Sequence, residues 1–529
     1  MIRETAIPVL DRKAMRTLIV GAFLGSVFEW YDFILYSTLV VFFSENFFPK
    51  GNPTAALLSS FATFGVGFVV RPFGALLFGH LGDRVGRKYT FLLTIVLMGA
   101  STTGIGLLPT FEQIGWAAPA LLMVLRLMQG LSLAGEYSGA ITYVAEHVED
   151  RRRGYQTSLN QVGVAVGNTL AVAVVLVARL MGREEFVRWG WRIPFLFSLV
   201  LLGISVYIRL RLEESPVFQE MKNARKQAKA PVIETFRNRK NLIFLVIAFV
   251  MVVGQVVIGY MRVYLLVFMP AVLKLDDVTT YLLISLGTLL TIPLGIFSGW
   301  WSDRVGRKWI MLSGCLLAAL TFFPIFRGLT HYGNPALEAA QRNTPVTVES
   351  SDCHLHFFAT ASTKLSACDR AKDFLTNRGV TFTSLPGSGG EVMTRIGGRE
   401  VRGFDPQQFA AALAEAGYPV KADPEKINLF MVELLIVVLS IYQALTFGPL
   451  GAFLVEQFPA RVRYTSVSVA YNFGAGWIGG LTPFFVTALS VSAGNIYYGI
   501  WFPVIVCAAV FVLGALLITE SKDRHIRDI

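Results

Sequence analysis

The feature that most constrains this chain of 529 residues is a series of apolar runs, each about twenty residues long or more. Runs such as 17–43 and 241–273 are long enough to cross a hydrocarbon core of about 30 Å. Hydrophobic residues make up 54% of the chain and charged residues only 16%, which disfavours a water-soluble protein. We therefore predict a polytopic membrane protein whose first run is retained, with no cleavable signal peptide.

The spacing of the runs predicts twelve transmembrane spans. To within about two to four residues at each end, they are expected at 17–43, 56–80, 89–108, 115–145, 158–180, 192–211, 241–273, 280–301, 308–326, 428–457, 465–490 and 497–519. Basic residues cluster in alternate connections, at 84–88, 151–153, 304–308 and 461–463, and such clusters mark the cytoplasmic side. Both termini are therefore expected in the cytoplasm. The net charge of +11 then reflects topology, and no nucleic-acid partner is expected.

Two internal repeats divide the chain into halves. The segment Gly79–Lys88 recurs as Gly299–Lys308, and both copies read Gly-x-x-x-Asp-Arg-Val-Gly-Arg-Lys. A second pattern places a Glu before an Arg and a Ser at equal spacing, as Glu146, Arg153 and Ser158 and as Glu456, Arg463 and Ser468. If both halves derive from one unit, the second carries roughly 90 extra residues between its two motifs.

The repeats predict an all-α polytopic membrane protein of two six-helix bundles with one insertion. Its expected parts are an N-terminal bundle (1–211), a cytoplasmic linker (212–240), a C-terminal bundle (241–326 and 428–529) and, between spans nine and ten, a small extracytoplasmic α/β insertion (331–426). Within the insertion, helices are expected near 369–377 and 406–416.

The four cysteines point to no metal or catalytic site. Cys315 and Cys507 lie in apolar runs and are expected to be small buried residues. Cys353 and Cys368 lie in the insertion, where an oxidising compartment would permit a disulfide, although spacing leaves their pairing open. The run from Cys353 to His356 has no second ligand cluster, so no metal is expected, and its alternation predicts one face of a strand.

No nucleophile constellation or phosphate-binding loop occurs, so neither an enzyme nor a cofactor is expected.

The repeated loops, each after an even-numbered span, resemble the signature of the major facilitator superfamily. Further segments resemble its metabolite and proton symporter branch, which includes citrate, oxoglutarate, shikimate and proline/betaine carriers: Glu29-Trp30-Tyr31-Asp32-Phe33, Arg71-Pro72-Phe73-Gly74, Gln129-Gly130, Gly135-Glu136, Glu214-Ser215-Pro216-Val217-Phe218 and Tyr471-Asn472-Phe473-Gly474. The insertion is absent from compact members of that branch, which weakens any inference about substrate. The fifth span, at 161–168, lacks the Gly-Pro pair of the proton antiporters, so uptake is favoured over export.

Charged residues inside spans are the candidates for proton coupling, because an ionised side chain in a bilayer is unfavourable unless paired or hydrated. Glu29 and Asp32 share one helical face of the first span. Asp32 is expected about 16 Å and Arg126 about 14 Å below the outer surface, so the two could meet. The resemblance to sugar/proton symporters implies that they form the coupling pair, with Glu136 deeper in the fourth span. The alternative is a static lattice of ion pairs that includes Glu136 and Arg71.

Polar side chains within the spans are the candidates for substrate binding: Tyr31, Arg71, Gln129, Gln255, Arg262, Tyr442, Gln443, Tyr471 and Asn472. Glu433 is a further buried charge near the outer end of the tenth span. A guanidinium such as that of Arg262 could hold a carboxylate through two hydrogen bonds, which would favour an organic acid. The alternative for Arg262 is that its side chain extends to the membrane surface.

The repeated motifs are candidates for gating. The residues concerned are Gly79, Asp83, Arg84, Gly86, Arg87, Glu146, Arg153, Asp303, Arg304, Gly306, Arg307, Glu456 and Arg463. The resemblance implies that Asp83 faces Arg463 and Tyr464, and Asp303 faces Arg153 and Gly154, so that each holds backbone N–H groups of the opposite half. Such contacts would hold the outward-facing state. The alternative is that the loops only set topology.

Together these features predict a monomeric bacterial inner-membrane transporter that takes up a small organic acid or zwitterion with protons, by alternating access. Its expected partners are that metabolite, protons and the lipid bilayer. One alternative is a proton-independent facilitator or exchanger of the same fold. Another is a membrane receptor that senses a metabolite through the insertion.

Overall fold

The structure is a computed structural model that describes residues 12–48, 63, 65–350, 366–387 and 392–526. Within these residues, eleven helical segments are long and apolar enough to cross a membrane. Helices suit this environment because they satisfy their own backbone N–H and C=O groups, which find no partners in lipid. The predicted second span, 56–80, lies partly outside the described residues and is seen as α3 (Arg71–Arg84). The count of twelve spans therefore stays a prediction.

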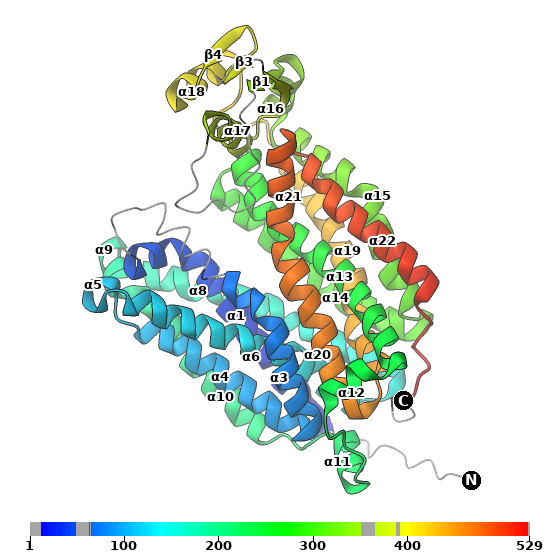
Figure 1. Cartoon of the computed structure of the whole chain (residues 1–529). Helices are drawn as coiled ribbons and strands as arrows, with labels where there is room; N and C mark the ends of the chain where they lie inside the picture. The colour runs from blue at the N-terminus through cyan, green and yellow to red at the C-terminus, as the bar shows by residue number, and fades with distance from the viewer. Residues whose placement is uncertain (1–11, 49–62, 64, 351–365, 388–391, 527–529) are drawn as a thin grey trace.

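The helices of the first half form one bundle, blue to cyan in Figure 1. They are α1 (Arg12–Phe47), α3, α4 (Arg87–Leu107), α6 (Ala117–His147), α7 (Arg153–Ser158) followed by α8 (Asn160–Arg179), and α10 (Arg192–Leu210). Short helical turns connect them: α5 (Phe111–Ile114), η1 (Asp150–Arg152), α9 (Arg183–Glu185) and η2 (Phe186–Gly190). Helix α1 packs along α8, and α4 packs against both α6 and α10.

The helices of the second half form the other bundle. They are α13 (Arg239–Val267) with its end η3 (Phe268–Val272), α14 (Asp277–Val305), α15 (Lys308–Gly333), α19 (Leu429–Gln457), α20 (Arg463–Phe473) continued by η5 (Gly474–Gly479) and α21 (Gly480–Ala493), and α22 (Trp501–Leu517). The turns η4 (Ala460–Val462) and η6 (Tyr498–Ile500) precede α20 and α22. Helix α14 packs against α19, and α15 packs against both α19 and α22.

Two short helices, α11 (Pro216–Asn223) and α12 (Pro231–Arg237), connect the bundles. The Ser215 hydroxyl caps α11 by accepting a hydrogen bond from the backbone N–H of Phe218 at 3.2 Å. Figure 1 shows the bundles meeting at the end where α11, α12 and the C-terminus lie, and diverging toward the opposite end. At the shared end, α3 packs on α20 and α7 packs on α14, so each contact joins the two halves.

A small α/β module, residues 335–415, projects from the second bundle (Figure 1). Its elements are α16 (Pro335–Asn343), β1 (Val346–Ser350), α17 (Ala367–Asn377), β2 (Phe382–Pro386), β3 (Met393–Ile396), β4 (Arg399–Arg402) and α18 (Pro406–Glu415). The strand order is β2-β1-β3-β4, with β1 parallel to β2 and antiparallel to β3, which pairs antiparallel with β4. Both expected helices are present as α17 and α18.

The module begins slightly later than predicted, because α15 continues through the polar residues after 326 and ends at Gly333. Asn334 then caps α16 by accepting from the N–H of Leu337 at 3.0 Å, and its side-chain amide donates to the carbonyl of Leu273 at 2.9 Å. The N–H of Phe382 donates to the carbonyl of Gly494 at 2.7 Å. These bonds fix the module to the end of α13 and to the turn after α21.

Candidate functional site

Asp32 lies at the centre of a buried polar cluster in the N-terminal bundle, with only 1% of its surface exposed. Its Oδ1 accepts hydrogen bonds from Thr102 on α4 and from the side-chain amide of Gln129 on α6, both at 2.7 Å. Arg126 donates to the side-chain oxygen of Gln129 at 2.8 Å, and its guanidinium lies 3.9 Å from the centre of the Tyr36 ring. Asp32 and Arg126 therefore share one cluster, but Gln129 stands between them where a direct pair was expected.

Glu136 belongs to a different cluster. Its carboxylate pairs with Arg209 on α10 and accepts a hydrogen bond from Thr94 at 3.1 Å. The Arg209 guanidinium also lies over the Phe91 ring, 3.4 Å from its centre, and both charged side chains are almost fully buried. Arg209 was not among the predicted site residues, because it lies near the end of an apolar run, where a basic residue normally signals topology.

A third polar cluster lies between the two bundles. Arg71 on α3 donates through Nε to the side-chain oxygen of Asn472 on α20 at 3.2 Å. At the neighbouring residue of α20, the Tyr471 ring stacks on the Tyr137 ring of α6 with centres 4.0 Å apart. Arg71 is also the charge that acts most strongly on the buried Glu29. Arg71 therefore points toward the opposite bundle and not toward Glu136.

Two substrate candidates point away from this interface. The Tyr31 hydroxyl donates to the carbonyl of Pro194 at 2.6 Å, so the side chain packs against the start of α10. The Tyr442 hydroxyl lies 2.9 Å from the hydroxyl of Thr321, so that side chain links α19 to α15. Both hydroxyls hold neighbouring helices of one bundle together.

Three further candidates lie within the second bundle. The side chain of Gln443 on α19 lies against Gly259 on α13, where an added Cβ would meet its oxygen at 2.9 Å. The side-chain oxygens of Gln255 and Gln443 are buried and have no hydrogen-bond partner among the described residues. Arg262 donates to two threonine hydroxyls of α14, at 2.7 and 2.9 Å.

The end of the molecule where the bundles meet is closed by contacts of the repeated motifs. Asp83, in the last turn of α3, accepts from the backbone N–H groups of Tyr464 at 3.1 Å and Thr465 at 2.8 Å, at the start of α20. The Tyr464 hydroxyl reaches back to the carbonyl of Gly135 at 2.8 Å. The sequence placed this contact one residue too early, at Arg463 and Tyr464.

We call the contacts of Asp83 with the start of α20 the first latch, and the equivalent contacts of Asp303 the second latch. Glu146, at the end of α6, completes the first latch. Its carboxylate pairs with Arg463 of the opposite bundle at 2.9 Å and with Arg87 at 3.3 Å, and it also accepts from the Ser215 hydroxyl. Arg87 donates to the carbonyl of Ala460, again in the opposite bundle, at 2.7 Å. The free-energy cost of removing the Glu146 carboxylate from water is offset here by two guanidinium partners and a hydroxyl.

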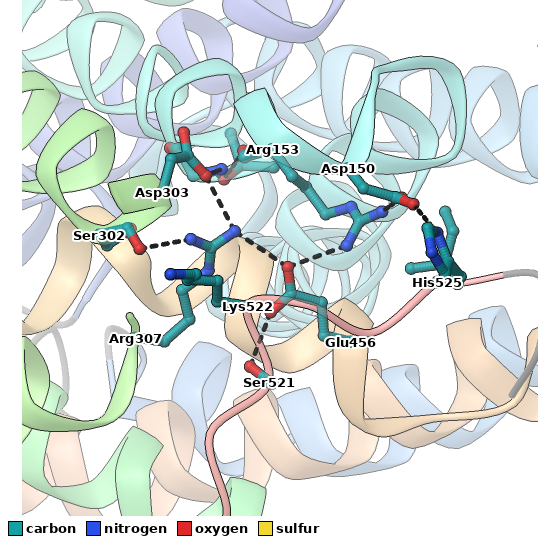
Figure 2. A network of polar contacts seen from close by, with 12 residues as sticks. Asp150, Arg153, Ser302, Asp303, Arg307, Glu456, Ser521, Lys522 and His525 are labelled. Atoms are coloured by element: carbon teal, nitrogen blue, oxygen red, sulfur yellow. Dashed lines mark hydrogen bonds and ion pairs between the residues drawn. The ribbon is translucent and has the colours of Figure 1, made fainter. Parts of the chain in front are cut away.

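The second latch repeats this arrangement with the halves exchanged (Figure 2). Asp303, in the last turn of α14, accepts from the N–H groups of Gly154 and Tyr155 at the start of α7, both at 2.8 Å. Glu456 accepts from Arg307 at 3.1 Å and from Arg153 of the opposite bundle at 2.9 Å. The contact again lies one residue beyond the predicted position.

The C-terminal tail takes part in the second latch. The Ser521 hydroxyl donates to Glu456 at 2.6 Å, as Ser215 does to Glu146 in the first latch. The imidazole of His525 lies 2.5 Å from Asp150, and Asp150 also pairs with Arg153 (Figure 2). The tail was not among the predicted site residues, although the Glu-Ser pair at 214–215 recurs in it at 520–521.

A glutamate after the last helix of each bundle caps the helix that follows the repeated loop. Glu214 accepts from the N–H groups of Arg87 and Lys88, and Glu520 accepts from those of Arg307 and Lys308. Burial raises the pKa of Glu214 above its ordinary value despite these hydrogen bonds. Burial acts on Glu520 in the same sense, but backbone N–H groups outweigh it and lower the pKa of Glu520.

Glycine is required where these glutamates approach the loops. Gly86 and Gly306 have φ of 138° and 118°, a conformation that favours glycine. A Cβ at Gly86 would meet Glu214 at 2.3 Å, and one at Gly306 would meet Glu520 at 2.4 Å.

Arg84 and Arg304 are the gating candidates that stay at the surface. Both are exposed, and the Arg304 guanidinium lies 3.8 Å from the centre of the Trp300 ring. Their positions fit the alternative role of basic residues that set topology.

Three of the four cysteines lie in the described part of the chain. Cys315 and Cys507 are buried and free, and Cys368, in the first turn of α17, is buried and disulfide-bonded. Cys353 and the predicted strand around it lie outside the described residues. Among the described residues, no group of three or more His, Cys, Asp or Glu could hold a metal ion.

The sequence matches a family model and several transporters. The model described as Major Facilitator Superfamily matches residues 19–331. The shikimate transporter of Escherichia coli K12 is 38% identical over 332 residues, which is 60% of this chain and 74% of that protein. The inner membrane metabolite transport protein YhjE of the same strain is 38% identical over 329 residues, with the same coverage. A putative proline/betaine transporter of Staphylococcus aureus COL is 37% identical over 323 residues, 60% of this chain and 68% of that protein.

The fold resembles solved transporter structures. The proton:xylose symporter XylE bound to 6-bromo-6-deoxy-D-glucose superposes with a TM-score of 0.66 over 97% of this chain and 98% of that one, at 14% identity. The partially occluded inward-open form of XylE from E. coli gives a TM-score of 0.60 over 97% of this chain and all of that chain. At this identity the likeness concerns the fold alone.

Proposed function

Since this chain belongs to the major facilitator superfamily, we propose that it takes up a small organic acid or zwitterion together with protons. Like its curated relatives, the chain is an integral membrane transporter, and it is not an enzyme. Its two bundles would alternate between outward-facing and inward-facing states around a central site. We place the end that carries the two latches, and with it both termini, in the cytoplasm of a bacterial cell, and we take the transporter to act as a monomer.

The environment of Asp32 is the observation that best supports proton coupling. It is a buried carboxylate whose Oδ2 has no hydrogen-bond partner among the described residues, while Oδ1 accepts from Thr102 and Gln129. Protonation would remove its charge and weaken its hold on Gln129, which would alter the position of Arg126. A proton taken up here would therefore change how α1, α4 and α6 contact one another, which is the element of coupling that transport requires.

The cluster between the bundles supports the substrate class. Arg71 offers a guanidinium to a carboxylate, Glu29 offers a negative charge to an amine or quaternary ammonium, and the Tyr137 and Tyr471 rings provide stacking surfaces. Such a mixture suits shikimate-like acids and betaine-like zwitterions, the classes named for the curated relatives. Glu136, paired with Arg209, would hold α6 and α10 together, so that the first bundle stays rigid as the transporter switches between its outward-facing and inward-facing states.

The test is uptake of labelled shikimate, citrate, oxoglutarate, proline and betaine into proteoliposomes, with and without an inward proton gradient. Wild type is compared with Asp32→Asn and with the exposed control Asp423→Asn. We expect gradient-driven accumulation of at least one compound by wild type and by the control. Asp32→Asn should lose accumulation but still exchange labelled for unlabelled substrate.

Two outcomes would contradict the proposal. Equilibration that ignores the gradient and is unchanged by Asp32→Asn would identify a facilitator. Absence of uptake for every compound in the panel would overturn the substrate class.

A further inference from the structure

A second set of buried polar groups lies within the C-terminal bundle, between α13, α14 and α19. Arg262 on α13 donates through Nη2 to the Thr288 hydroxyl at 2.7 Å and through Nη1 to the Thr291 hydroxyl at 2.9 Å. Each threonine gives its own hydroxyl hydrogen to a carbonyl one turn earlier in α14, at 2.7 and 2.9 Å. Both threonines can therefore only accept from Arg262, so the guanidinium is held here by neutral groups.

Glu433 on α19 lies beside this arrangement without joining it. Its Oε1 is 3.7 Å from the position that a Cβ on Gly287 would occupy, so the carboxyl group lies against α14. The nearby Ser440 hydroxyl donates to the carbonyl of Gly287 at 2.9 Å. Both Glu433 oxygens are buried, and neither has a hydrogen-bond partner among the described residues.

The charges around Glu433 are few. Arg262 is the cation that acts on Glu433, from beyond ion-pair distance. On α15, which also packs against α19, His331 pairs with Glu338 and Arg327 acts on Tyr497. An ionised carboxylate with neither a hydrogen bond nor a direct partner is strongly disfavoured inside a bilayer, so the neutral acid is the form that fits this environment.

The arrangement mirrors the one in the first bundle. There the carboxylate is on the first helix and the arginine on the fourth, as Asp32 on α1 and Arg126 on α6. Here the arginine is on the first helix and the carboxyl group on the fourth, as Arg262 on α13 and Glu433 on α19. A static ion-pair lattice would join Arg262 to Glu433 directly, whereas the structure holds them apart.

We propose that Glu433 is a second proton-carrying group of this transporter, with Arg262 as the cation that receives its carboxylate when the proton leaves. The step is a simple ionisation: the Glu433 O–H bond breaks, the proton passes to water, and the carboxylate draws Arg262 away from Thr288 and Thr291. The contacts between α13 and α14 then change in the second bundle. This inference rests on the proposed function, because a second carrier matters only in a proton-coupled transporter.

The first experiment measures Glu433 directly and does not depend on transport. Infrared difference spectra of the purified full chain at acid and alkaline pH should contain a buried protonated-carboxyl band that is absent from Glu433→Gln and present in the exposed control Glu425→Gln. Glu433→Asp should retain a titrating band, which keeps the test valid if the glutamine variant folds poorly. Arg262→Gln should shift the titration midpoint of the band, because it removes the cation proposed to receive the carboxylate.

The second experiment measures the proton:substrate ratio from the substrate gradient at which net flux stops. Glu433→Gln should lower the ratio by one proton, whereas Glu425→Gln should leave it unchanged. Spectra without a Glu433 band, or a midpoint unmoved by Arg262→Gln, would overturn the proposal. Wild-type uptake that ignores the proton gradient would instead refute symport, and the infrared band would still show whether Glu433 titrates.

Discussion

Asp83 of the first bundle accepts a hydrogen bond at 3.1 Å from the backbone N–H of Tyr464 in the second bundle. The donor is one of the unpaired N–H groups at the start of α20, where the helix dipole also favours a negative charge. Asp303 makes the equivalent contact with the start of α7. The closed end of the molecule is therefore held by carboxylates that each reach across to the opposite half, and under the proposed orientation this closure corresponds to the outward-facing state.

Replacing either aspartate by asparagine should open the cytoplasmic side. Asp83→Asn keeps one acceptor oxygen but loses the charge, so the outward-facing state should weaken by about 2 kcal/mol, roughly thirtyfold in population. Spin labels at the exposed positions Arg152→Cys in η1 and Val305→Cys at the end of α14, two elements that contact each other, would report the change as a longer distance. Asp303→Asn should act similarly, and an unchanged distance in both variants would mean that the latches do not hold this state.

An added methyl group should prevent the two bundles from closing. A Cβ at Gly79 would lie 2.8 Å from the Cα of Thr465 across the interface, and one at Gly299 would lie 2.6 Å from the carbonyl oxygen of Gly154. Gly79→Ala and Gly299→Ala should each slow uptake at least tenfold by disfavouring the outward-facing state. Gly203→Ala is the matched control, because its Cβ would meet nothing within 4 Å. Equal rates for all three variants would contradict the close approach.

Gln129 should be essential for coupling, because it connects Asp32 to Arg126. Gln129→Leu removes one hydrogen bond to each charged partner, worth about 1.5–3 kcal/mol apiece. We expect gradient-driven accumulation to fall by tenfold or more, measured as the initial rate of uptake against external pH. The exposed control Gln408→Leu should behave as wild type. Full activity of Gln129→Leu would mean that Asp32 and Arg126 act independently.

Glu214 and Glu520 should respond to acid in opposite ways. The folded-state pKa of Glu520 is below its ordinary value of 4.5, so its contribution to stability is present above pH 4.5 and is lost as the pH falls through the folded value. The pKa of Glu214 is raised, so its contribution declines as the pH rises from 4.5 through the folded value.

Thermal unfolding of the purified chain at several pH values would test this. The difference in Tm between wild type and Glu520→Gln should shrink as the pH falls below 4.5. The corresponding difference for Glu214→Gln should move in favour of wild type as the pH falls toward 4.5 from above, and should then stay constant below 4.5. Parallel curves for the two variants would contradict the opposite shifts.

Much of this architecture could be predicted from the sequence, because apolar length and repeated loops carry it. The family resemblance is confirmed, and the loop contacts were displaced by one residue only. Depth along a helix axis placed Asp32 near Arg126, but it gives no rotation about that axis, so the intervening Gln129 could not be foreseen as their link.

Other contacts depend on the reach of side chains between elements distant in sequence. Arg209 looked like a terminal charge, yet its guanidinium extends back into the bundle to Glu136. Glu520 and Ser521 repeat the Glu-Ser pair at 214–215, but this recurrence alone does not say that their side chains reach Arg307 and Glu456.

The described backbone and capping bonds of the α/β module and its flanking residues run to one bundle: Phe382 to Gly494 after α21, and Asn334 and Ala422 to Leu273 and Lys274 after α13. The module should therefore move together with the second bundle in the proposed transport cycle. A dye attached to the exposed Glu415 would be displaced further by a rotation of the second bundle than a label within its helices. Such a dye could therefore report single transport cycles.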